Sequence, residues 1–268
     1  MAYQALYRRW RPQTFESVVG QTATVKTLRH QIETGQIAHA YLFCGCRGTG
    51  KTTMAKLMSR AINCLNPNHG DPCGQCEVCR AIQTESTMDV LELDAASNNS
   101  VDNIRELLEQ VRYPAQMGKY KVYIIDEVHM LSTAAFNALL KTLEEPPAHV
   151  VFILATTEPQ KLPATIRVQR YDFGRIPSEL MIGRMKEALD ELHMTAEPEA
   201  LQLVARAAEG AMRDAFSILD MCVAGAENGT ITAAQVRDAA LLTVSFCSRS
   251  WTASPTGTRR AFCARWTS

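Results

Sequence analysis

Short apolar runs alternate with helical segments along the first part of the chain, up to about residue 175. The runs are "AYLFCG" (40–45), "DVLELDA" (89–95), "KVYIIDE" (121–127) and "VVFILATT" (150–157). Runs of this length between polar turns are typical of buried strands. Two segments between these runs have helical spacing: "KTTMAKLMSRAINC" (51–64) and "STAAFNALLKTLEEPP" (132–147). The second begins with a serine cap and is stopped by two prolines. Strands that alternate with helices predict a parallel α/β sheet.

From Pro177 onward the strand-like runs cease and only helical spacing remains. The segments are "PSELMIGRMKEALDELH" (177–193), "EPEALQLVARAAEG" (197–210) and "AMRDAFSILDMCVAGA" (211–226). The pattern therefore predicts two domains, an α/β domain over residues 1–175 and a small three-helix domain over residues 176–242.

Residues 243–268 lose this periodicity. The segment holds two of the three tryptophans, which is unusual for a disordered tail. Two interpretations stay open: an aberrant, disordered tail, or a frameshift. If suitable codons are chosen, reading the same bases in the frame that starts at each third codon position gives a helix-like sequence. In that frame each Trp–Thr pair must encode an aspartate, because its bases contain GAC. Reading the gene would decide between them.

Composition and charge restrict the function classes. The chain is 46% hydrophobic and 21% charged, close to globular averages. Its 28 basic residues balance 28 acidic ones, so no overall positive field favours nucleic-acid binding. We see no signal-peptide core and no run of the ~18 apolar residues that a membrane span needs. We therefore expect a cytoplasmic protein, in which clustered cysteines more often bind metal than form disulfides.

A phosphate-binding loop follows the first predicted strand. Gly45, Gly50, Lys51 and Thr52 match the pattern G-x-x-x-x-G-K-[ST]. Such a loop turns backbone amides toward phosphates, its lysine neutralises the β- and γ-phosphates, and its hydroxyl binds Mg²⁺. The residues expected to contact the nucleotide are Gly45, Cys46, Arg47, Gly48, Thr49, Gly50, Lys51, Thr52 and Thr53.

Two acids end the strand at 121–127. At that end of a parallel sheet, Asp126 would lie beside the phosphate loop and hold Mg²⁺ together with Thr52. Glu127 would orient or deprotonate the attacking water. Solvated acids at a strand end are the plainer alternative. Together with the phosphate loop, the pair predicts an ATPase.

Two further positions are candidates for contact with the nucleotide. Thr156 and Thr157 end the strand at 150–157, where a hydroxyl near the γ-phosphate would position water, although threonine commonly ends strands. Arg213 begins a helix of the second domain and would reach the nucleotide across the domain cleft. A surface arginine is the alternative.

Four cysteines lie within "CLNPNHGDPCGQCEVC". Cys64, Cys73, Cys76 and Cys79 have the spacing C-x₈-C-x₂-C-x₂-C, and four thiolates suit tetrahedral Zn²⁺. His69 is a spare ligand candidate, and a redox pair would explain only two of the four sulfurs. With no ligand position left open, the site is expected to be structural.

Long motifs in a fixed order resemble one known family. They are "YRRWRPQTFESVVGQ", "HAYLFCGCRGTGKTT", "CGQCEVC", "ELDAASNNSVDNIRELL", "KVYIIDEVHMLSTAAFNALLKTLEEPP" and "ILATTEPQKLPATI". Over residues 1 to about 242 the chain resembles the gamma/tau subunits of the bacterial DNA polymerase III clamp loader, which are AAA+ ATPases. The resemblance implies an AAA+ domain with an inserted zinc module at about 64–79, followed by a helical lid domain.

The resemblance also implies partners and residue roles. In this family, subunits join delta, delta-prime and further copies of themselves in an arc that opens a ring-shaped sliding clamp with ATP. Primed DNA, contacted through its backbone, then triggers hydrolysis. By the same resemblance Thr157 is the first sensor and Arg213 the second, and Arg11, Val19 and Gly20 lie near the adenine.

The chain departs from the family pattern in two places. The family usually follows "LPATI" with Leu-Ser-Arg-Cys, whose arginine reaches the ATP of the neighbouring subunit; here the text "LPATIRVQRYDF" is two residues shorter. Arg167 is the candidate finger and Arg170 a further one; a finger of this kind raises turnover by about 10³ or more. The resemblance also leads us to expect a third domain, the collar, and the given sequence stops before it.

Three functions are therefore compared. The first is an ATP-driven clamp-loader motor subunit within the DNA polymerase III holoenzyme. The second is a truncated subunit that binds ATP and partners but does not hydrolyse. The third is another AAA+ ATPase, such as a recombination helicase loader, against which the cysteines and "DAASNN" argue.

Overall fold

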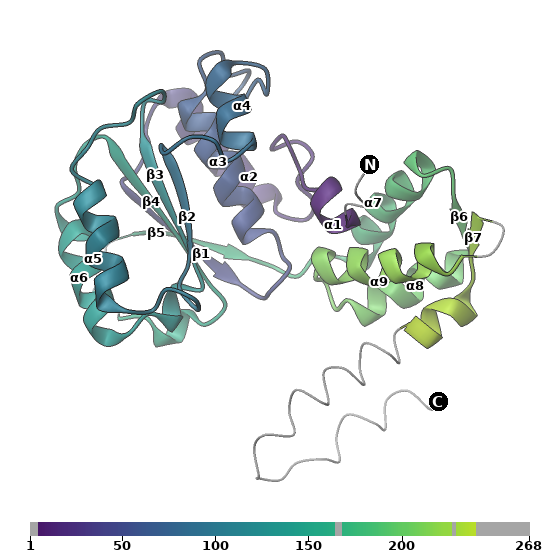
Figure 1. Ribbon diagram of the computed structural model, residues 1–268. Helices are drawn as coiled ribbons and strands as arrows, with labels where there is room; N and C mark the ends of the chain where they lie inside the picture. Colours follow the sequence, from purple (N-terminus) through teal and green to yellow (C-terminus); the bar gives the residue numbers. More distant parts are fainter. Residues whose placement is uncertain (1–4, 164–167, 227–228, 240–268) are drawn as a thin grey trace, which may run out of the picture.

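The chain forms two lobes. The computed structural model describes residues 5–163, 168–226 and 229–239, so Arg167 and the segment 243–268 lie outside the described residues. Figure 1 shows a larger α/β lobe joined to a smaller helical lobe, with the N-terminal segment between them.

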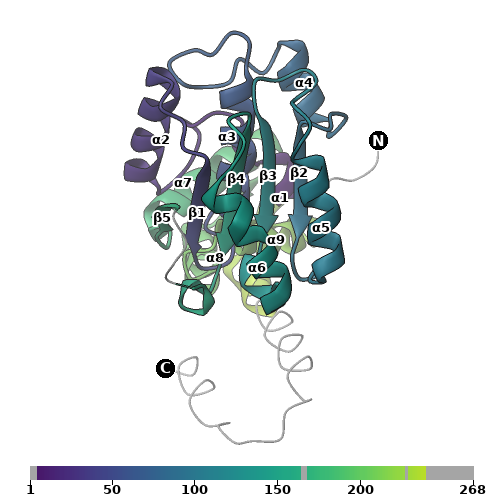
Figure 2. The same cartoon turned by 90° about the vertical axis from the view of Figure 1, so that its left-hand side faces the viewer.

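The larger lobe contains a five-stranded parallel sheet in the order β2-β3-β4-β1-β5. The strands are β1 (Ala40–Gly45), β2 (Val90–Asp94), β3 (Lys121–Asp126), β4 (Val150–Thr156) and β5 (Gln169–Phe173). The predictions of β1 to β4 are confirmed. We did not predict β5, because this edge strand carries mostly exposed side chains and lacks an apolar run. Figure 2 shows β2 and β5 at the two edges of the sheet.

Helices cover both faces of this sheet (Figure 1). On one face α2 (Thr22–Thr34) and α3 (Lys51–Asn63) pack on side chains such as Tyr41 and Phe43. On the other face α5 (Val101–Gln110) and α6 (Thr133–Glu144) pack on Leu42 and its neighbours. Alternate residues of β1 therefore enter two separate cores. Both predicted helices are confirmed, and the Ser132 hydroxyl caps α6 by accepting a hydrogen bond from the Ala135 amide at 3.2 Å.

The smaller lobe packs α7 (Ser178–Glu191), α8 (Pro198–Ala207) and α9 (Met212–Ala224) around one core. The three helices predicted here are confirmed. The short helix α1 (Leu6–Arg9) belongs to the same core through Leu6.

The smaller lobe also holds elements that we did not predict. The expectation that strands cease after Pro177 is wrong, because β6 (Thr195–Ala196) pairs in parallel with β7 (Thr230–Ile231). A further helical segment begins at residue 233. Strands of two residues leave no periodic signal in the sequence. Among the described residues, no helix is long and apolar enough to cross a membrane.

Candidate functional site

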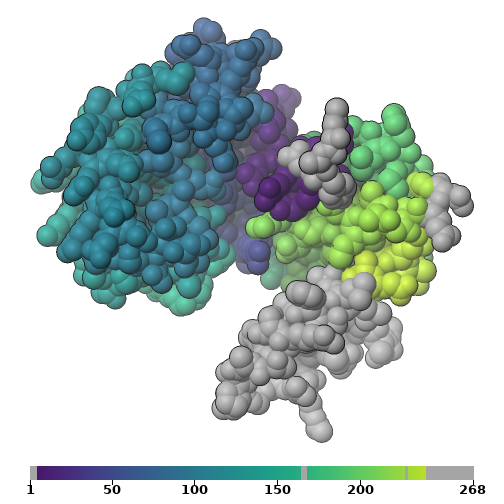
Figure 3. Space-filling model, viewed as in Figure 1, coloured from purple at the N-terminus to yellow at the C-terminus, as the bar shows by residue number. Residues whose placement is uncertain are grey.

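A cavity of about 550 Å³ lies where the two lobes meet. Figure 3 shows this junction, with the N-terminal segment in purple between the lobes. The predicted site residues that line the cavity are Arg11, Val19, Arg47, Gly48, Thr49, Gly50, Lys51, Thr52, Thr53, Asp126, Glu127 and Arg213. Four predicted residues, Gly20, Gly45, Cys46 and Thr157, are not among the described residues that line it.

The phosphate loop requires glycine where other segments approach it closely. Gly45 has φ +148°, and a Cβ there would lie 2.4 Å from the Phe173 carbonyl oxygen of β5. At Gly48, with φ +76°, a Cβ would lie 2.8 Å from the Ala211 Cβ. The Met212 amide donates to the Gly48 carbonyl at 3.0 Å, so the first turn of α9 is fixed to the loop. The lid thus contacts the phosphate loop through backbone atoms.

Lys51 lies across the mouth of the loop. Its ammonium donates hydrogen bonds to the carbonyl oxygens of Gly45 at 2.7 Å and Cys46 at 2.9 Å. Burial lowers the pKa of Lys51, although the carboxylates of Glu127 and Asp126 oppose this shift. A buried ammonium between backbone amides and two acids is suited to exchange these carbonyls for phosphate oxygens.

The two predicted magnesium ligands lie together. Thr52, in the first turn of α3, donates its hydroxyl to Asp126 Oδ2 at 2.6 Å, and Asp126 ends β3. A hydroxyl and a carboxylate are oxygen ligands that Mg²⁺ accepts while keeping several waters. The pair therefore fits the ion and lies at the start of α3, where the helix dipole favours phosphate.

Glu127 and Thr157 also meet. Glu127 has a left-handed backbone with φ +48°, and its Oε2 accepts hydrogen bonds from the Thr157 hydroxyl at 3.0 Å and the Thr157 amide at 3.2 Å. Thr156 has a different partner, because its Oγ1 lies 3.0 Å from His129 Nδ1. The two neighbouring threonines, which we considered together, therefore have different partners, and of the two only Thr157 forms a hydrogen bond with Glu127.

The lid and the N-terminal segment supply cations and aromatic rings. The Arg213 guanidinium lies 5.2 Å from the centroid of the Tyr7 ring, and Arg184 of α7 lies 4.8 Å from that of Trp10. All four residues line the cavity. Sequence reasoning assigned no role to Tyr7, Trp10 or Arg184, although Tyr7 and Trp10 lie in the first of the family motifs; Arg184 lies outside all of them. Gly20 lies against Ile176: a Cβ added at Gly20 would be 3.2 Å from a side-chain carbon of Ile176.

Of the two candidate arginine fingers, the structure describes only Arg170. Arg170 lies on the edge strand β5, where its side chain is 55% exposed and forms an ion pair of 2.8 Å with Asp172. It is not among the described residues that line the cavity. A role toward a neighbouring subunit stays a prediction, as it does for Arg167.

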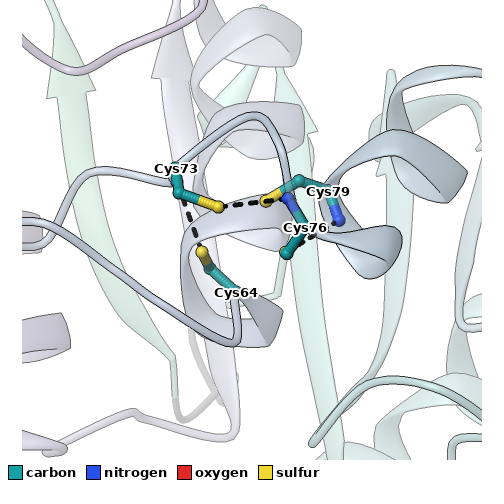
Figure 4. A group of neighbouring side chains, drawn as sticks. All are labelled: Cys64, Cys73, Cys76 and Cys79. Carbon is teal, nitrogen blue, oxygen red and sulfur yellow. Dashed lines mark hydrogen bonds between the residues drawn. The ribbon is translucent and has the colours of Figure 1, made fainter.

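The four cysteines converge on one point (Figure 4). Their Sγ atoms all lie within 4.8 Å of one another. Zinc–sulfur bonds of about 2.3 Å in a tetrahedron place sulfurs about 3.8 Å apart, so the set fits zinc. Cys64 ends α3, and Cys76 caps α4 (Glu77–Gln83), which contains Cys79. His69 is not part of this group.

Backbone amides favour the thiolate of Cys73, whereas burial raises the pKa of Cys64 and of Cys79. The amide of Cys73 donates to Cys64 Sγ at 3.3 Å, and that of Cys76 donates to Cys73 Sγ at the same distance. The amides of Gln75 and Cys76 lower the pKa of Cys73 to about 6. The 13 residues of α3 separate Cys64 from the phosphate loop by roughly 20 Å at 1.5 Å per residue. The cluster is therefore too far from the cavity to touch a nucleotide there.

Together, the parallel sheet, the phosphate loop, the acids after β3 and the helical lobe define an AAA+ P-loop NTPase. Solved structures agree on the fold: that of Thermotoga maritima RuvB, the Holliday junction branch migration motor, matches with a TM-score of 0.63. The match covers 87% of this chain and 72% of that one, but at 17% identity it shows the fold alone.

Sequence comparisons assign the family. Residues 20–176 match the family described as DNA polymerase III, delta subunit, and residues 181–228 match the DNA polymerase III clamp loader subunit, ATPase lid domain. The chain belongs to the family of DNA polymerase III clamp-loader subunits and is similar to its tau and gamma members. This confirms the resemblance found in the sequence.

Curated relatives give the extent of the similarity. The chain is 52% identical to DNA polymerase III subunit tau of Bacillus subtilis over 91% of its own length and 43% of the relative's. It is 49% identical to subunit tau of Escherichia coli, over 87% of its own length and 37% of the relative's. The chain thus spans less than half the length of these two relatives.

Proposed function

We propose that this chain binds ATP and Mg²⁺ at the lobe junction and hydrolyses ATP as a motor subunit that loads a sliding clamp onto primed DNA. The observation that carries the proposal is the arrangement at the ends of β3 and β4. Lys51 and the Thr52–Asp126 pair stand at the phosphate loop, and Glu127 is fixed to Thr157 beside them.

Each residue has a chemical task in this proposal. The loop amides and Lys51 bind the β- and γ-phosphates, while Thr52 and Asp126 hold Mg²⁺, which neutralises developing charge. Glu127 orients the attacking water and accepts its proton. Arg213 reaches the nucleotide from the lid. The lid is therefore expected to move when ATP is hydrolysed or released.

The partners in this proposal follow from the family. They are delta, delta-prime, other copies of this chain, the clamp and the backbone of primed DNA, and the activity is that of an ATPase within the DNA polymerase III holoenzyme. Zn²⁺ on Cys64, Cys73, Cys76 and Cys79 would hold the inserted segment at the end of α3, with a structural role.

ATP hydrolysis by the purified chain tests the proposal. It is measured alone and with delta, delta-prime, the clamp and primed DNA, beside a Lys51→Ala control. We expect hydrolysis that the partners stimulate and that the control lacks. No hydrolysis by the unsubstituted chain under any of these conditions would overturn the motor function.

One observation favours a second function, an ATP-binding subunit that does not hydrolyse. Arg170 is paired with Asp172 away from the cavity, and the segment that precedes it is two residues shorter than the family pattern. Tight ATP binding with a flat, low rate of hydrolysis in the presence of all partners would identify this function.

A further inference from the structure

Behind the proposed general base lies a buried imidazole that no motif assigns. His129 belongs to the 3₁₀ turn η1 (Val128–Met130), and the left-handed backbone of Glu127 starts this turn. Only 6% of the His129 side chain is exposed. A buried polar ring needs partners for both nitrogens.

One nitrogen faces the base and the strand beside it. His129 Nδ1 lies 3.0 Å from Thr156 Oγ1 and 3.4 Å from Glu127 Oε2. The same Glu127 oxygen accepts both hydrogen bonds from Thr157. Among the described residues, every hydrogen bond to the Glu127 carboxylate ends on Oε2, so Oε1 is the oxygen left to accept a proton from water.

The other nitrogen faces a second, anchored carboxylate. His129 Nε2 lies 3.3 Å from Glu158 Oε1, which also accepts a hydrogen bond from Lys161 at 2.9 Å. The hydrogen bond from Lys161 holds the pKa of Glu158 below its ordinary value, so an ionised acceptor faces Nε2. Both ring nitrogens therefore face carboxylate oxygens, Nδ1 that of Glu127 and Nε2 that of Glu158.

The ring therefore connects two segments that hold the base. The Glu158 amide donates to Thr156 Oγ1 at 3.0 Å, which closes the network on the residues after β4. Thr156, Thr157 and Glu158 are consecutive, so a shift of this segment reaches Glu127 both directly from Thr157 and through His129. The hydrogen bond between Nδ1 and Thr156, together with the carboxylates that face both nitrogens, fixes the orientation of the ring beside Glu127.

We propose that His129 is a positioning residue that fixes the Glu127 carboxylate toward the attacking water and couples it to the segment Thr156–Glu158. This inference rests on the proposed hydrolysis of ATP. Among the described residues, the polar partners of His129 are Thr156, Glu127 and Glu158, and His129 does not line the cavity. Its removal should therefore leave nucleotide binding intact and slow the chemical step.

The test separates binding from turnover in the chain with its partners present. His129→Ala should lower kcat between about tenfold and about a hundredfold, the loss expected when a reacting group is misplaced, with ATP affinity within about twofold of the unsubstituted protein. His129→Asn should recover part of this loss, because its amide lies near the place of Nδ1. The matched control is His149→Ala, which removes a ring bonded to the Val111 carbonyl at 3.1 Å just before β4 begins.

Glu158→Gln keeps the inference testable if the His129 variants fold poorly. Glu158 is 37% exposed, so this substitution carries little risk to folding. It should lower kcat less than His129→Ala does, and it should add nothing in the His129→Ala background, since both act through one ring.

The outcomes separate the two proposals. No hydrolysis by the unsubstituted chain with all partners overturns the proposed function. Hydrolysis by the unsubstituted chain together with an unchanged kcat in His129→Ala and Glu158→Gln overturns only the role of His129. A His129→Ala variant that loses ATP affinity, kcat and thermal stability together, while Glu158→Gln keeps full turnover, shows a merely structural histidine and overturns the inference as well.

Discussion

Asp89 should be one of the most sensitive positions for the stability of the α/β lobe. It directly precedes β2, and its carboxylate accepts three backbone hydrogen bonds from the segment that leads into β3. Oδ1 accepts from Gln116 at 2.7 Å, and Oδ2 accepts from Met117 at 2.7 Å and Gly118 at 2.8 Å. The residue is 1% exposed. These bonds fix the approach to β3, the strand that ends in Asp126.

The Asp89→Asn substitution keeps the shape and removes the charge. An amide has one acceptor oxygen, so its NH₂ must face at least one of the three backbone N–H groups. A hydrogen bond to a charged group contributes about 1.5–3 kcal/mol and a neutral one about 0.5–1.5 kcal/mol. With one bond lost and two weakened, we expect the free energy of unfolding to fall by about 3–5 kcal/mol.

The pH dependence of this effect has a definite sign. Burial raises the pKa of Asp89, but the amides of Gln116, Gly118 and Met117 lower it by more, so the folded value lies below the ordinary one. A depressed folded pKa gives stability that is fully present above the unfolded value, ~3.9, and is lost as the pH falls through the folded value. The difference between the two proteins should therefore be constant near neutral pH and shrink below about pH 4.

Urea unfolding followed by circular dichroism at several pH values measures this difference. The control is Asp102→Asn, whose carboxylate is 78% exposed and pairs with Arg105 at 3.4 Å, so it should change stability by at most about 1 kcal/mol. A loss below about 1 kcal/mol for Asp89→Asn, or a loss unchanged down to pH 2, would refute the reasoning from these three bonds.

Three further substitutions test other parts of the site. Gly45→Ala should abolish ATP binding in a calorimetric titration, because its Cβ would lie 2.4 Å from a backbone oxygen; ordinary affinity would show that the loop tolerates the shift. Cys76→Ser should reduce bound zinc from about one per chain to near zero in elemental analysis, since one of four thiolates is lost; unchanged zinc content would contradict the predicted site. Thr157→Val should slow hydrolysis about tenfold or more without weakening ATP binding, because it removes the hydroxyl that holds Glu127; an unchanged rate in a steady-state assay would contradict this role.

Short apolar runs determined which strands could be predicted from the sequence, and they include β2, although none of its residues is fully buried. The strands β1, β3 and β4 are buried almost throughout and appear as continuous apolar runs. The edge strand β5 has one buried residue, Phe173, and its pairing with β1 depends on a partner far away in the sequence. Its run "QRYDF" therefore resembles a loop, although its last residue contacts the phosphate loop.

Local strings predicted the phosphate loop and the acids, whereas residues whose partners are distant in sequence gave no signal. The tandem threonines show the limit most clearly. Thr156 is the last residue of β4 and its buried side chain meets His129, whereas Thr157 lies just beyond the strand and its side chain meets Glu127. The sequence placed both residues at the end of one strand, but it could not establish which one faces the base. That assignment depends on the turn after β3, where the left-handed Glu127 brings its own carboxylate to one threonine and the ring of His129 to the other. A substitution at either threonine is therefore expected to disturb the same carboxylate by a different path.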